Sequence, residues 1–215
     1  MAQSPESAEP FAGQLIQLWS LREDVEVAAG DGAEHLSLKW NSGTEWIGDP
    51  TPLVRNVLSR MELGPVVLDN AWPAPTGPED PDPYEVLLPV FERLSHLIVR
   101  TLGVDDLRGP LLSVVPVAEG AQLVLAGRRD GRALRTAVGL SMAFGESSVR
   151  LQTASSPHHV LIHRPEPIWV VGLLGWPVTP AVVSDALPLP AEVTDAILDY
   201  LAVAGMVVPD GDPTD

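Results

Sequence analysis

Three histidines, His158, His159 and His163, lie close together in the second half of the chain. Imidazoles two strand steps apart can converge on a metal ion, and His159 and His163 fall on one face of a strand-like segment. The simpler interpretation is that Val160 and Ile162 take the other face and the histidines form an ordinary polar side. Because the chain has no cysteine to join them, we expect no metal site here.

A cluster of arginines is the second group that can do chemistry. Arg128, Arg129, Arg132 and Arg135 fall within eight residues. Guanidinium groups bind carboxylates through paired hydrogen bonds, so the cluster can clamp the acidic side chains of a peptide. The alternative is that it forms a solubilising hairpin tip on an acidic protein.

Other motifs that carry chemistry are missing from the sequence. The one lysine, Lys39, follows no glycine-rich loop, which excludes a P-loop. The segment from Gly145 to Ser148 indicates a hairpin turn rather than a nucleophile elbow, and no dinucleotide-binding fingerprint follows a strand. We therefore expect a chain that is not catalytic alone and that holds no cofactor of its own.

The last long stretch predicts three helices followed by a strand. Pro167 opens an apolar run that Gly175 and Pro177 stop, Thr179 caps a short second helix, and Pro190 opens a third that ends at Gly205. Residues 206–208 then favour a strand. This order is typical of the helical half of a winged helix.

Charge argues against nucleic acid as the partner of that winged helix. The chain has a net charge of -16, and residues 165–215 contain no lysine or arginine. The third helix carries Glu192, Asp195 and Asp199, which phosphates would repel. We interpret the module as a peptide-binding relative of the DNA readers, in which these acids and the strand residues Val160 and Ile162 line the peptide groove.

The first half has a similar order of strands followed by helices. Alternating apolar residues between positions 19 and 47 predict three short strands, and Pro52 opens a helix that Gly64 closes. Apolar residues spaced by three and four positions then predict a helix from Leu87 to Leu102. We therefore predict an α+β fold of two tandem winged-helix modules, each a small antiparallel sheet with three helices.

The predicted boundaries divide the chain into five parts. These are a disordered N-terminus at 1–16, module 1 at 17–107 with a Pro-rich insert at 70–83, a connector at 108–122, module 2 at 123–209, and an acidic tail at 210–215. The connector is apolar, whereas a solvated linker is polar. We expect the connector to pack against protein, either against a partner that contacts Leu111, Leu112, Val114 and Val115 or within the chain's own core.

Several segments resemble the N-terminal region of actinobacterial SagB-type peptide dehydrogenases. They are residues 20–27, 63–70, 109–117, 160–165 and 200–209, which occur in the same order and span most of residues 19–209. Members of that family bind FMN in a C-terminal nitroreductase-like part and oxidise azolines to thiazoles or oxazoles in ribosomally made peptides. Their N-terminal part is similar to the winged-helix clamps that hold leader peptides.

The resemblance implies a role in the biosynthesis of such peptides, which include the thiopeptides. This chain ends where the flavin domain would begin, so the resemblance implies a leader-peptide-binding subunit of a split dehydrogenase, with FMN in a partner subunit. The alternatives are a structural subunit that stabilises the flavoenzyme and a winged-helix transcription regulator. The polar N-terminus has no apolar segment of a signal peptide, so we expect a cytoplasmic protein without a membrane partner.

Overall fold

A computed structural model describes residues 13–29, 35–71, 82–122 and 131–211. These residues form an α+β fold of eleven strands, five α-helices and two short 3-10 helices. In chain order the elements are β1 (Leu15–Leu21), β2 (Glu26–Ala29), β3 (His35–Trp40), β4 (Gly43–Gly48), α1 (Pro52–Leu63), η1 (Leu68–Asn70), α2 (Pro83–Arg93), η2 (Ser95–Leu97), β5 (Ile98–Val104), β6 (Pro110–Pro116), β7 (Leu134–Thr136), β8 (Ser141–Phe144), β9 (Val149–Gln152), β10 (His158–Ile162), α3 (Pro165–Leu173), α4 (Pro180–Ala186), α5 (Ala191–Val203) and β11 (Val207–Pro209).

The two halves of the chain follow the same order of elements. Each begins with a strand, β1 or β7, continues with a three-stranded meander, β2-β3-β4 or β8-β9-β10, and then enters helices. A single residue after the first helix, Val66 or Val178, bridges back to that first strand. The strand after the last helix, β5 or β11, pairs with the first strand on its other side.

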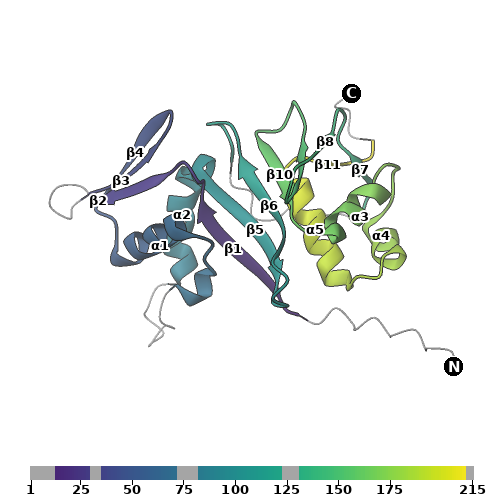
Figure 1. The fold of residues 1–215 in the computed structure, drawn as a ribbon, viewed down its shortest axis with the longest axis horizontal. Coiled ribbons are helices and arrows are strands. Elements are labelled where there is room, and N and C mark those ends of the chain that lie inside the picture. Colours follow the sequence, from purple (N-terminus) through teal and green to yellow (C-terminus); the bar gives the residue numbers. More distant parts are fainter. Residues whose placement is uncertain (1–12, 30–34, 72–81, 123–130, 212–215) are drawn as a thin grey trace.

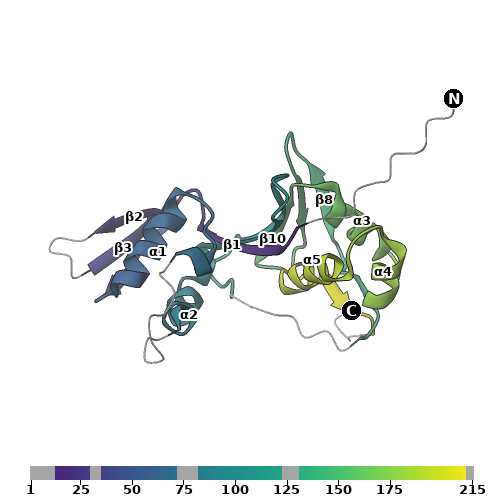
Figure 2. The ribbon, with the colours of Figure 1, turned by 90° about the horizontal axis from the view of Figure 1, so that it is seen from below.

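Strand β6 joins the halves into one sheet of order β1-β5-β6-β10-β9-β8. It pairs antiparallel with β5 from the first half and with β10 from the second. Figure 1 shows the long strands β1, β5 and β6 between α1 and α2 on one side and α3, α4 and α5 on the other. The view from below separates the two groups of helices in the same way (Figure 2).

The helices bury one face of this sheet. Cross-strand neighbours share a face, so the register defines a row across all six strands that consists of Trp19, Arg100, Val114, Val160, Leu151 and Met142. The first five of these residues are buried. Trp19 belongs to the core packed by α1 and α2, whereas Val114, Val160 and Leu151 belong to the core packed by α3, α4 and α5.

Arg100 lies where the two cores meet. Its guanidinium carbon is 5.3 Å from the centre of the Trp19 ring and 4.9 Å from that of Tyr200. The side chain is 5% exposed. A buried guanidinium stacked on two aromatic rings gains cation–π attraction in a desolvated setting, so Arg100 couples the first half to α5.

Local sequence signals explain most of the helices. Pro52 and Pro180 occupy first-turn positions, and the preceding Thr51 and Thr179 accept hydrogen bonds from backbone N–H groups of the first turn. Gly205 has φ 69 just after α5, as a helix-ending glycine requires. The predicted helices beginning at Pro52, Pro180 and Pro190 and the final strand at β11 are confirmed.

One predicted helix is wrong. The expected helix from Leu87 to Leu102 ends at Arg93, and residues 98–104 form β5. The apolar spacing was compatible with a helix, but Ile98, Val99 and Thr101 are β-branched and favour an extended backbone. Residues 134–136 form β7, which pairs with β11.

Candidate functional site

Each three-stranded meander ends in a strand that leads into the helices. In the second half this strand is β10, whose expected free edge is occupied by β6 with a register from His158 opposite Pro116 to Ile162 opposite Leu112. The other edge pairs with β9. Val160 and Ile162 are also buried in the core. The expected groove along β10 is therefore wrong, because both edges of the strand already have partners.

The place of β6 beside β10 explains why the connector is apolar. Leu111, Leu112 and Val114 lie in β6 and are 0%, 0% and 4% exposed, and Val115 is half-buried on the other side of the strand. Their apolar character therefore stabilises this chain's own core, and the expectation that they form a surface for a partner is wrong. A short apolar run bounded by Pro110 and Pro116 is typical of a central strand.

Strand β4 presents the equivalent edge in the first half. It pairs with β3 from Gly43 opposite Trp40 to Gly48 opposite His35, and its other edge pairs with none of the strands described here. Thr44, Trp46 and Gly48 are exposed, while Ile47 is buried. The Trp46 side chain is 56% exposed, which is large for an indole on a monomer surface.

An arginine from α2 reaches this edge. Arg93 donates from Nε to Glu45 Oε1 at 2.8 Å and from Nη2 to the Trp46 carbonyl at 2.6 Å. The Trp46 carbonyl therefore points away from β3. In an antiparallel strand the N–H and C=O of one residue point to the same side, so the Trp46 N–H also faces the open edge.

The remaining predicted site residues lie apart from this edge. Glu192 is exposed and Asp195 and Asp199 are half-exposed on α5, on the helix that covers the large sheet. Asp199 lines a small cavity of about 230 Å³ with Gln17 and Arg100. The three acids do not face β4, so the structure does not bring them together with the open edge.

Two of the four clustered arginines lie in the described chain. Arg132 donates to the Asp210 carbonyl at 3.2 Å, and Arg135 lies 3.5 Å from the Asp210 carboxylate. These contacts hold the end of β11 against β7. Arg128 and Arg129 lie outside the described residues, so the cluster as a whole stays a prediction.

The face of the large sheet opposite the buried row forms a groove of about 560 Å³, which none of the described helices lines. A second cross-strand row lies on this face, one residue out of step with the buried row, and consists of Leu18, Thr101, Ser113, Leu161, Arg150 and Ala143. The four middle residues of this row line the groove. His159 and His163 flank Leu161 on β10, as the alternation of this strand predicted. The turn at residues 22–24 and Pro65 line the other end.

Two hydroxyl groups and one imidazole form a hydrogen-bonded chain on the floor of this groove. Thr101 Oγ1 is 2.8 Å from Ser113 Oγ, which is 3.0 Å from His163 Nε2. Burial lowers the pKa of His163, and burial followed by the nearby Arg150 and His158 charges lowers that of His159. Both imidazoles therefore favour the neutral form near neutral pH.

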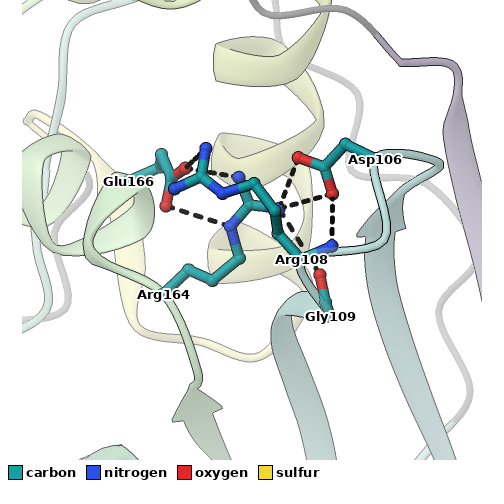
Figure 3. Close-up of polar contacts among 5 residues, drawn as sticks. All are labelled: Asp106, Arg108, Gly109, Arg164 and Glu166. Atoms are coloured by element: carbon teal, nitrogen blue, oxygen red, sulfur yellow. Dashed lines mark hydrogen bonds and ion pairs between the residues drawn. The ribbon is translucent and has the colours of Figure 1, made fainter.

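A network of buried charges holds the turn between β5 and β6 (Figure 3). Arg164, which is 7% exposed, donates to Glu166 at 2.5 Å and to both Asp106 oxygens at 3.0 and 2.9 Å. Burial opposes ionisation of Asp106, but hydrogen bonds from the Arg108 backbone and the Arg164 side chain outweigh it and lower the pKa of this carboxyl. The network fixes the start of β6, which the central strand requires.

No protein-family model and no curated protein matches this chain. Among the described residues, no group of three histidines or carboxylates is arranged to hold a metal ion. Within the same ranges, every helix is too short or too polar to cross a membrane.

Proposed function

We propose that this chain is a non-catalytic, cytoplasmic subunit that binds an extended leader peptide for a separately encoded FMN-dependent azoline dehydrogenase. In this proposal each half is a winged-helix peptide clamp, and the peptide adds as a strand to β4. The product is a thiazole or oxazole in a ribosomally made peptide. The flavin belongs to the partner subunit.

The observation that carries the proposal is the pairing of β6 with β10. The two meanders occupy the same place in the repeated element order, so β6 is an internal example of a strand added to the third strand of a meander. The same edge of β4 has no strand partner among the described residues. Main-chain hydrogen bonds of this kind are a common way to hold an extended peptide.

The surroundings of β4 support binding of an extended chain. The exposed Trp46 side chain offers a large apolar surface beside the edge, and indoles are frequent anchors in interfaces. Arg93 is held by Glu45 on the outer side of the strand, where its hydrogen bond to the Trp46 carbonyl shows that this edge accepts a donor from outside the sheet. The acidic charge of the chain argues for a protein rather than a nucleic acid as partner.

The partners can be identified by purifying the tagged full chain from its native host. We expect a flavin protein and a precursor peptide to copurify, and the chain alone to be colourless. A stoichiometric flavin on the isolated chain would contradict the proposal. Recovery of the flavin protein without any affinity for its precursor peptide would instead indicate a purely structural subunit.

The binding mode can be tested by fluorescence anisotropy with the copurified precursor peptide, labelled with fluorescein. Trp46→Pro removes the outward N–H together with the indole, and proline is tolerated on an edge strand, so we expect binding to be lost while the circular dichroism spectrum is retained. The matched variant Trp46→Ala keeps the backbone donor and should weaken binding by roughly tenfold through loss of the indole. Equal affinity of wild type and Trp46→Pro would exclude strand addition at β4.

A further inference from the structure

The groove on the open face of the large sheet has a chemistry that the proposed peptide site does not use. Its floor combines apolar side chains of Val99, Val115 and Leu161 with the polar pair Thr101 and Ser113. The two hydroxyl residues are only 5% and 7% exposed, although no residue of the helices described here lines the groove. A volume of about 560 Å³ falls in the range of cavities that bind small molecules or short peptide segments.

Positive and polar groups gather at one end of this groove. Arg150 on β9 lies directly across from Leu161 on β10, with His159 and His163 on either side of that leucine and on the same face. Arg150 is exposed, and its charge is felt by His159. In a chain of net charge -16, this end is a local exception that attracts an anion.

The opposite end of the groove has a different charge. Asp24 is paired there with Arg22 at 2.8 Å, and the exposed Glu23 adds a further negative charge. A ligand with anions at both ends would be repelled at Glu23. A ligand with one anionic group and an apolar body suits the groove, because the anion can lie at the Arg150 end, away from Glu23, and the apolar body can lie on the floor.

We propose that this groove binds a carboxylate attached to an apolar body. The carboxylate accepts hydrogen bonds from the Arg150 guanidinium, beside His159. The apolar part of the ligand lies over Val99, Val115 and Leu161. The Thr101–Ser113–His163 chain fixes the His163 ring from below and so keeps the floor in shape. The carboxylate belongs either to a free organic acid or to a glutamate side chain of a peptide.

The test uses two carboxylate probes with the full chain, 4-phenylbutyrate for a free acid and acetyl-Leu-Ala-Glu-amide for a peptide. Their neutral counterparts are 4-phenylbutanamide and acetyl-Leu-Ala-Gln-amide. Binding is followed by NMR through the imidazole resonances of His159 and His163. We expect saturable shifts with at least one carboxylate and not with its amide, and the probe that binds identifies the source.

Two arginine variants separate the site from general charge effects. Arg150→Gln should weaken the carboxylate probe roughly tenfold or more, because a charged hydrogen bond is lost. Arg60→Gln on α1 removes another exposed positive charge, outside the groove, and should leave affinity unchanged. The proposal is overturned if neither carboxylate saturates, if the amides bind equally well, or if the two variants have the same effect.

Discussion

Strands β4 and β10 hold the same position in the two halves of the molecule but have different neighbours. Each ends a three-stranded meander and leads into helices. β10 has β6 on its outer edge and lies in the middle of a six-stranded sheet, whereas β4 ends a three-stranded sheet. The same position in the element order is therefore closed by the chain's own strand β6 in the second half, whereas in the first half the outer edge of β4 meets none of the described strands.

The comparison depends on β6 being structural, which Leu112→Asp tests most severely. Leu112 is fully buried opposite Ile162, so an unpaired carboxylate there should destabilise the fold by about 4 kcal/mol or more. We expect loss of the cooperative unfolding transition measured by thermal circular dichroism. Val117→Asp, at a position that is 53% exposed, is the matched control and should change stability by less than about 0.5 kcal/mol. A folded Leu112→Asp variant would mean that β6 is not needed to fill β10.

The next largest loss of stability is expected in the charged network around Arg164, which fixes the start of β6. Arg164→Met leaves Glu166 and Asp106 without their shared cation, and breaking a buried pair costs about 3–5 kcal/mol. The free energy of unfolding measured in urea should fall accordingly. Arg108→Met removes a neighbouring arginine that is 63% exposed and 3.9 Å from Glu166, and it should have a small effect. Similar losses in both variants would assign the effect to local charge rather than to the buried contacts.

Acid should weaken the same network by a smaller amount. The folded pKa of Asp106 lies below the value of about 3.9 for an unfolded aspartate, so its contribution is complete above that value. The contribution is lost as pH falls through the folded pKa, because the unfolded state then binds the proton first. Unfolding measured from pH 6 to pH 3 should show a steeper loss for wild type than for Asp106→Asn. Parallel curves would show that Asp106 contributes nothing to acid sensitivity.

The smallest expected effect is at the open edge itself. Trp46→Ala removes a side chain that is 56% exposed, so the free energy of unfolding should change by no more than about 0.5 kcal/mol. Val160→Ala, the matched change on β10, removes fully buried methyl groups and should cost at least about 1 kcal/mol. Equal costs measured by urea unfolding would show that Trp46 is part of the core and that the two edges do not differ as described.

Local patterns predicted the elements whose signals are complete within a few residues. Proline and threonine fixed the starts of α1 and α4, and alternation placed His159 and His163 on one face of β10. The strand β5 was mistaken for the end of a helix, because Leu94, Ile98 and Leu102 are spaced for either structure. Residues 98–104 form a strand because β5 and β6 are buried together in one sheet, which is an effect of tertiary structure.

The groove could not be predicted from spacing along the chain. Thr101, Ser113, Leu161 and Arg150 become neighbours only through the registers of β5 with β6, β6 with β10, and β10 with β9. The number of residues between them in the sequence does not indicate which residues of neighbouring strands face each other. Arg132 contacts the backbone carbonyl of Asp210 and Arg135 lies near its carboxylate, so both meet a residue of the same chain, and the clamp for an acidic peptide stays a prediction.

The position of β6 has a consequence for how the protein folds during synthesis. Its partner β5 precedes it directly, but its partner β10 begins more than forty residues later. A ribosome that adds about 5–20 residues per second therefore leaves the β10-facing edge of β6, with Leu112 and Val114, without its partner for roughly two to ten seconds. During this interval the first half carries an unprotected apolar edge that other nascent chains can pair with. Truncation after residue 122 would make this interval permanent, and such a fragment is expected to aggregate where the full chain does not.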